Sequence, residues 1–120
     1  RDLRAYAERF VAREVPRVHV SGLLLTFDPT RPEGARLVSL TTADGRAIDD
    51  DRLYTIVLND FLVTGGDGLA LAGRAQSVVP LNIVDLDALI GYLRQLPQPV
   101  RAPAEERIRR ATAGTTPATR

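Results

Sequence analysis

The sequence contains no cysteine, methionine or tryptophan, and it has a single histidine, His19. The lack of cysteine excludes a disulfide framework and a thiolate metal site. One histidine cannot supply the cluster of ligands that a two-metal hydrolytic site needs, so we expect a structural or surface role for His19. No apolar run approaches the roughly 18 residues that a membrane helix requires. We therefore expect neither a metal cofactor nor a membrane span in this chain.

Lysine is absent as well, so all 16 basic residues are arginine, and they nearly balance 15 acidic residues. The net charge of +1 provides no general attraction for nucleic acid or an anionic membrane. The exclusive use of arginine is typical of a GC-rich genome rather than of phosphate recognition. A length of 120 residues fits one compact domain. The lack of methionine and a start at Arg1 favour a fragment or processed product of a longer protein.

A helix is expected at the N-terminus, over residues 2–14. Its apolar residues recur at the i, i+3, i+4 and i+7 spacing of an amphipathic helix: Leu3, Tyr6, Ala7, Phe10 and Val11. Asp2 is a candidate N-cap. Pro16 is expected to end the helix.

The middle of the chain is expected to form strands joined by tight turns. The candidate strands cover residues 17–28, 35–42, 46–48 and 54–58. Asp44 and Gly45 form a preferred two-residue hairpin turn, and Gly22 permits a bend. Because hairpins are more evident than βαβ units, we predict an α+β fold with an antiparallel or mixed sheet of hairpin-linked strands flanked by helices.

The last third of the chain is expected to contain one more helix, over residues 85–96, after an extended segment at 77–84. Asp85 is placed to cap this helix. Its apolar residues share one face: Leu86, Leu89, Ile90 and Leu93. Prolines punctuate residues 97–110, which should lie over the surface, and residues 111–120 have too little apolar content to be ordered.

The most unusual stretch is NDFLVTGGDGLA, residues 59–70. Three glycines around Asp67 indicate a backbone that needs positive φ or close approach by another group. In one interpretation this is a tight loop after a buried strand, with Phe61 filling the core. In the other, Phe61 lies where a strand meets a loop, and its ring could stack on a flat heteroaromatic base for about 1–3 kcal/mol. Asn59, Asp60 or Asp67 would then bind the polar edge of the base.

Several segments of the chain form one combined pattern: YTIVLNDFLVTGGDG, the upstream VSGLLLTFDPTRPEGARLVSLTTADGRAIDD, and the downstream DLDALIGYL and ERI. This pattern resembles the C-terminal domain of the 5′-nucleotidase family, which includes UDP-sugar hydrolases and cyclic-nucleotide phosphodiesterases. The resemblance runs from Leu3 to Ile108. It implies a substrate-specificity domain over residues 1–110, incomplete at its N-terminal side, followed by the disordered tail at 111–120.

In that family the domain binds the nucleoside part of the substrate, with the base held between two phenylalanines. The second of these aromatic residues falls on Phe61, and the aspartate of the glycine loop falls on Asp67. The first lies upstream of anything matching Arg1, so only half of the slot is expected here. The resemblance, together with the residues of the glycine stretch, gives six expected substrate-binding residues: Phe61, Asp67, Asn59, Gly65, Gly66 and Gly68.

The resemblance also implies that the chemistry lies elsewhere. The family hydrolyses phosphate esters with two divalent metals in an N-terminal metallophosphoesterase domain, which would be the partner of this chain in the same protein. We expect no catalytic residue here. Asp49, Asp50 and Asp51 lack the spacing of a calcium loop and are expected to form a solvated turn, and GGDG lacks the Lys-Ser/Thr of a P-loop.

Two functions remain open. The first is a nucleoside-binding specificity domain of a secreted, periplasmic or cell-surface nucleotidase, with a nucleotide or nucleoside as its ligand. The second is a non-catalytic binding or structural module of the same fold, including a family branch with a non-nucleotide substrate. A sheet that lacks its upstream strands would expose an edge, through which the chain could self-associate.

Overall fold

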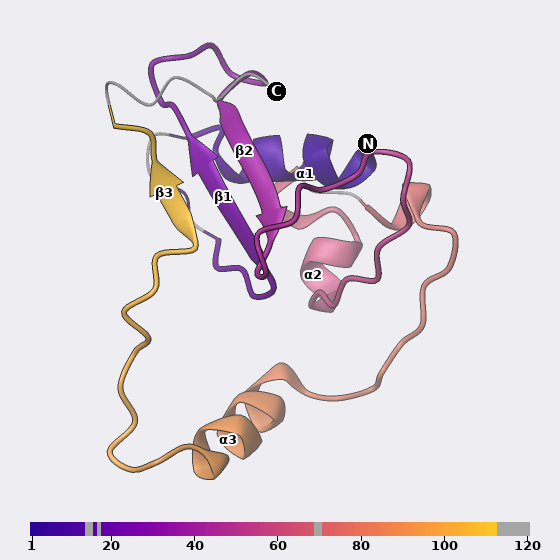
Figure 1. Ribbon diagram of the computed structural model, residues 1–120. Helices are drawn as coiled ribbons and strands as arrows, with labels where there is room; N and C mark the ends of the chain where they lie inside the picture. Colours follow the sequence, from indigo (N-terminus) through magenta and orange to yellow (C-terminus); the bar gives the residue numbers. More distant parts are fainter. Residues whose placement is uncertain (14–15, 17, 69–70, 113–120) are drawn as a thin grey trace.

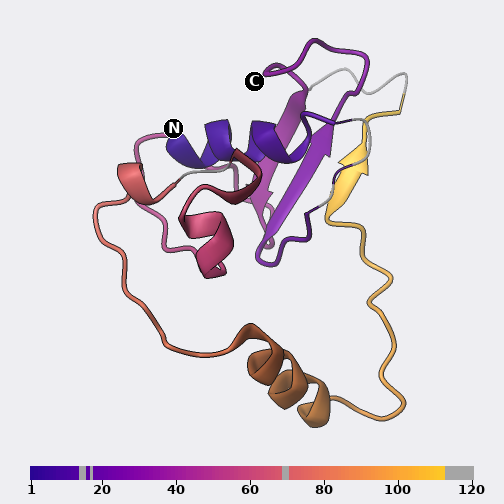
Figure 2. The same ribbon diagram turned by 180° about the vertical axis from the view of Figure 1, so that it is seen from behind.

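The computed structural model describes residues 1–13, 16, 18–68 and 71–112. A three-stranded sheet lies at its centre, helix α1 (Asp2–Phe10) crosses one face of the sheet, and helix α3 (Asp85–Gln95) stands apart from both (Figure 1, Figure 2). The sheet is mixed, so the predicted α+β class is confirmed. No helix among the described residues has the length and apolar character needed to cross a membrane. Most of the predicted disordered tail, residues 113–120, lies outside the described part of the chain.

The sheet is built around β1 (Leu23–Phe27), with β2 (Leu37–Thr42) on one side and β3 (Ile108–Arg110) on the other. β1 and β2 are antiparallel and form the first predicted hairpin. β3 runs parallel to β1, with Ile108 opposite Leu25. β3 is absent from the prediction because Ile108 is its one apolar residue, so the segment shows no alternating apolar pattern.

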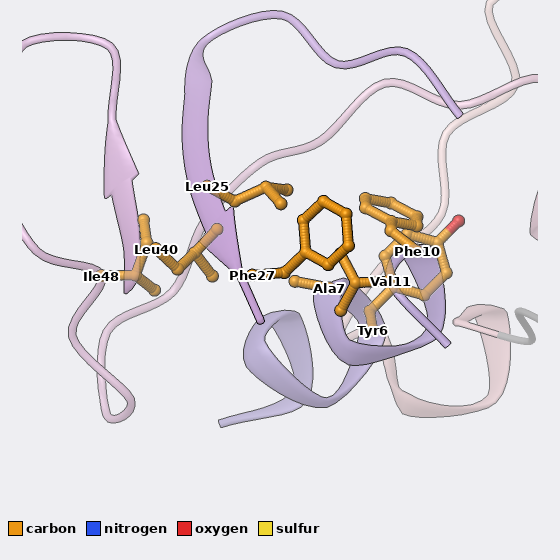
Figure 3. Close-up of a cluster of buried hydrophobic side chains, with 8 residues drawn as sticks. All are labelled: Tyr6, Ala7, Phe10, Val11, Leu25, Phe27, Leu40 and Ile48. Atoms are coloured by element: carbon orange, nitrogen blue, oxygen red, sulfur yellow. The ribbon is translucent and has the colours of Figure 1, made fainter. Parts of the chain in front are cut away.

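Eight side chains form the core between α1 and the sheet (Figure 3): Tyr6, Ala7, Phe10, Val11, Leu25, Phe27, Leu40 and Ile48. Half of them come from α1 and the residue that follows it, so the amphipathic pattern identified the buried face of this helix correctly. The rings of Tyr6 and Phe10 meet edge to face, with their centroids 4.8 Å apart. Burial raises the pKa of the Tyr6 hydroxyl.

The boundaries of α1 differ from the prediction. The helix ends at Phe10 rather than just before Pro16, and residue 14 of the predicted helix lies outside the described part of the chain. Asp2 is its first helical residue rather than its N-cap, because Arg1 occupies the N-cap position without a side-chain capping bond. The Asp2 carboxylate instead accepts a hydrogen bond of 2.8 Å from the Arg74 guanidinium.

Glu8 fastens α1 to the start of β2. One carboxylate oxygen accepts a hydrogen bond of 3.1 Å from the backbone N–H of Arg36, and the other accepts one of 3.0 Å from the N–H of Leu37. Hydrogen bonds to a charged acceptor contribute about 1.5–3 kcal/mol each. This pair therefore holds the helix that supplies half of the core in register with the sheet.

Three predicted strand segments are not formed. Residues 46–48 make a single bridge, from Thr41 to Ala47. Residues 54–58 have no strand pairing, and the described part of residues 17–22 is likewise not in a strand. A segment with an apolar pattern forms a strand only where a neighbouring strand has backbone N–H and C=O groups left to pair with it. β1 has both of its edges occupied, and the outer edge of β2 is used by residues 46–48.

α3 confirms the predicted helix, but it exposes the face that should be buried. The four apolar residues of that face are between 36% and 58% exposed: Leu86, Leu89, Ile90 and Leu93. Two extended segments connect α3 to the rest of the molecule in both views (Figure 1, Figure 2). The predicted cap is wrong, because Val84 holds the N-cap position without a side-chain bond and Asp85 is already helical.

Candidate functional site

The glycine-rich stretch forms a short helix followed by a turn of 3-10 helix. Helix α2 covers Asp60–Val63 and η1 covers Gly66–Gly68. The sequence had suggested a strand that ends near residue 61, and the helix takes its place because Asn59 supplies an N-cap. Leu69 and Ala70 lie outside the described residues.

The Asn59 side chain is part of the framework of this turn. Its Oδ1 atom accepts a hydrogen bond of 2.9 Å from the backbone N–H of Leu62. The Oδ1 atom of Asp60 similarly accepts one of 2.8 Å from the N–H of Phe61. For Asn59, the oxygen is therefore engaged by the helix, and the amide nitrogen is the atom it can offer to a ligand.

Phe61 is not a core residue. Its side chain is 57% exposed, whereas Phe27 in the core is 2% exposed. The interpretation of Phe61 as a filler of the core is therefore wrong. An exposed phenyl ring on a short hydrogen-bonded helix is a surface on which a flat, apolar ring can stack.

The glycines on either side of Asp67 give the turn its shape. Gly65 has φ of 103° and Gly68 has φ of 72°, a region that residues with a Cβ rarely adopt. The backbone N–H of Gly68 donates to the carbonyl of Gly65 at 3.1 Å and closes the turn. The Asp67 backbone lies within η1, and its side chain is outside what the structure describes.

The six residues predicted to bind substrate thus lie along one continuous turn, residues 59–68. Their common position follows from adjacency in the chain. Their role in binding stays a prediction.

The turn is anchored to the rest of the molecule at both ends. Leu58, Leu62 and Leu71 are partly buried and pack against the core. Beyond the turn, Arg74 in η2 (Ala72–Arg74) pairs with Asp2 at the start of α1. The hydrogen bond from Arg74 lowers the pKa of the Asp2 carboxyl. The leucines of this segment thus pack against the core, while Phe61 on the same segment is exposed.

The other candidate residues of the sequence take no part in this turn. His19 is exposed and lines an open groove of about 520 Å³ beside β3, away from Phe61. The guanidinium of Arg107 in that groove is engaged by the Val20 carbonyl at 3.0 Å and by Glu105 at 3.2 Å. Residues 49–51 are exposed in a turn, as expected. Across the described residues, no three His, Cys, Asp or Glu side chains are grouped so that they could hold a metal ion.

The fold and the site define a small α+β domain that displays an aromatic side chain on a glycine turn. The model of the 5′-nucleotidase C-terminal domain family matches residues 4–74, more than half of the chain, and the chain belongs to this family. The resemblance noted in the sequence is confirmed.

Similar proteins agree with this assignment. The crystal structure of the 5′-nucleotidase precursor from Thermus thermophilus is 32% identical, with a TM-score of 0.79 over 91% of this chain and 23% of that one. Cell wall protein Lmo0130 of Listeria monocytogenes is 31% identical over 94 residues, which are 77% of this chain and 12% of that protein. The 5′-nucleotidase of Diplobatis ommata is 28% identical over 86 residues, 66% of this chain and 15% of the relative. The chain therefore spans less than a quarter of the length of each of these proteins.

Proposed function

We propose that this chain is the nucleoside-binding specificity domain of a metal-dependent 5′-nucleotidase-type phosphoesterase. The observation that carries the proposal is Phe61, an exposed ring on an ordered turn of a 5′-nucleotidase C-terminal domain. The ring is not part of the hydrophobic core, so filling the core does not explain an aromatic side chain at this position. Stacking on a nucleobase would explain the aromatic side chain and would contribute about 1–3 kcal/mol per base.

In this proposal the domain binds and positions the substrate, while the reaction takes place on another domain. A pair of divalent metals in an N-terminal metallophosphoesterase domain would activate water and stabilise the leaving oxygen. The energy of base binding, remote from the phosphate, would place the phosphate at that centre. The Asn59 amide nitrogen and the backbone of the turn at Gly65, Gly66 and Gly68 would contact the nucleoside beside the ring, together with Asp67.

The proposed location is outside the cytoplasm. Two relatives support it by their names, one a cell wall protein and the other a precursor of a 5′-nucleotidase. A nucleotidase at the cell surface or in the periplasm would act on nucleotides that arrive from outside.

The experiment is a comparison of two substrates in the full-length protein that contains this chain. We expect Phe61→Ala to raise KM for a nucleoside monophosphate by about 5- to 150-fold, the equivalent of the lost stacking energy. Hydrolysis of a small phosphate ester without a base should be nearly unchanged, since it never contacts the ring. Val57→Ala is the matched control, because Val57 is an exposed apolar side chain nearby in sequence, 77% exposed.

Equal effects of Phe61→Ala on the two substrates, including no effect on either, would contradict a role in base recognition. A second candidate would then take precedence: a binding or structural module whose ligand is not a nucleotide. The observation in favour of this candidate is the similarity to a relative that is named for the cell wall and not for a nucleotide. In that case Phe61→Ala would leave both KM values unchanged.

A further inference from the structure

The ring of Phe61 lies directly against Gly66. A Cβ atom added to Gly66 would lie 2.5 Å from Cδ1 and 2.6 Å from Cζ of the Phe61 ring, and closer still to Cε1. Real Cβ atoms do not approach other atoms to less than 3.0 Å. A residue with any side chain at position 66 is therefore incompatible with the present position of the ring.

The backbone conformation at Gly66 is not the reason for a glycine there. Gly65 and Gly68 have positive φ, and Gly66 does not. An alanine at position 66 could thus adopt the backbone conformation without strain. What the glycine provides is space for the phenyl ring.

The clash would be relieved by movement of the ring rather than of the fold. The three atoms that a Cβ would meet belong to the far end of the Phe61 side chain, which is 57% exposed and can turn toward solvent. The base of the same side chain is fixed, because the Asn59 cap and the Thr64 hydroxyl, which donates to the Asp60 carbonyl at 2.9 Å, hold α2 in place. The backbone that carries Phe61 is thus held in place, and the lack of a side chain at Gly66 leaves room for the ring in its present position.

We propose that Gly66 is a positioning residue that sets the orientation of the Phe61 ring and, through it, the geometry of the stacking surface. This inference rests on the proposed function for its effect on substrate, but the position of the Phe61 ring against Gly66 is a property of the free protein. Gly66→Ala should displace the ring, preserve the fold and weaken binding of the base.

The position of the ring is tested without any ligand. Proton NMR of this chain should show nuclear Overhauser contacts between the Phe61 ring and the α-protons of Gly66, and these contacts should be lost or redistributed in Gly66→Ala. Gly73→Ala is the control, because Gly73 has no positive φ and no atom within 4 Å of an added Cβ. If the contacts are missing in the unmodified chain, or persist unchanged in Gly66→Ala, the proposal is overturned.

The effect on substrate is tested by a double-mutant cycle in the full-length protein. Gly66→Ala should raise KM for a nucleoside monophosphate by about 10-fold with kcat unchanged, which lies within the ~100-fold that a 1 Å misplacement caused by a mutation far from the chemistry can cost. In a Phe61→Ala background the same substitution should have no further effect, because no ring is left to displace. An undiminished effect in that background would overturn the positioning role. If Phe61→Ala itself leaves KM unchanged, the proposed function fails, while the NMR result still decides whether Gly66 sets the position of the ring.

Discussion

The Asn59 cap offers a sharp test of how the turn is held. Asn59→Ala removes the 2.9 Å hydrogen bond from the Leu62 N–H and leaves this donor at the start of a four-residue helix without its partner. Loss of an asparagine cap costs about 1 kcal/mol, within a range of about 0.5–2. No residue of α2 is buried, so we expect this energy to be lost mainly from the local stability of the turn.

The magnitude can be measured by hydrogen exchange under native conditions. A loss of about 1 kcal/mol should raise the exchange rate of the Val63 and Thr64 amides by roughly 5-fold, since 1.36 kcal/mol corresponds to a factor of ten. These amides donate to the carbonyls of Asn59 and Asp60 in the first turn of α2. Amides of β1 should be unaffected.

Asn59→Asp separates the cap from any role in binding. Aspartate is as good an N-cap as asparagine, so exchange in the turn should remain as slow as in the unmodified chain. The carboxylate has no N–H to donate, so an interaction of the amide nitrogen with the base would be lost in the same variant. The reasoning would be refuted if Asn59→Ala left the exchange of these amides unchanged, or if Asn59→Asp exchanged as fast as Asn59→Ala.

Two further predictions concern the support of the site. Glu8→Gln should lower the free energy of unfolding, measured in urea, by about 1.5–3 kcal/mol, because an amide has one oxygen in place of two for the backbone N–H donors. Glu33→Gln, in an exposed turn, is the control and should change this free energy little. Equal urea midpoints for the two variants would contradict the prediction. The hydrogen bond from Arg4 lowers the pKa of Asp50 below 3.8, so the stabilisation is complete above about pH 5 and is lost as the pH falls through the folded-state pKa. The difference in unfolding free energy between the unmodified chain and Arg4→Gln should therefore shrink as the pH falls below about 5 and the Asp50 carboxylate becomes protonated, and a constant difference would show that the pair is not linked to protonation.

Local signals in the sequence were sufficient for the parts of the fold that depend on neighbours in the chain. The spacing of Tyr6, Phe10 and Val11 identified the buried face of α1. The pair Asp44-Gly45 identified a turn in which Gly45 has φ of 85° and its N–H bonds to the Thr42 carbonyl. Both features are decided by contacts over a few residues, which is why periodicity and turn chemistry predict them.

Pairing between distant segments was beyond such signals. Residues 54–58 have the composition of a strand, but β1 pairs with β2 on one side and with β3 on the other, and the choice between segments is made by packing. The exposure of α3 is of the same kind, since its apolar pattern predicts a partner without saying which part of a protein provides it.

For the candidate site, the sequence predicted the stretch but not its conformation. Phe61 and the glycines were identified from composition and resemblance. Asn59 carried a recognisable signal for a helix start, as a good cap before Asp60, but the preceding apolar run at 54–58 favoured a strand followed by a loop. The contact between Phe61 and Gly66 has no signature in the sequence, because any tight turn can contain a glycine.

The parallel pairing of β1 with β3 governs the order in which the molecule can assemble. β1 ends at Phe27, and its second neighbour begins at Ile108, so the α2 turn and α3 both lie inside the loop that this pairing closes. During synthesis, α1 and the β1–β2 hairpin can form early, while the central strand keeps an open edge until the last described strand has left the ribosome. Closure of so long a loop by three residues adds its entropic cost at the final step. A protein cut short before Ile108 would thus carry an intact turn at residues 59–68 on a sheet whose middle strand is still available to another chain.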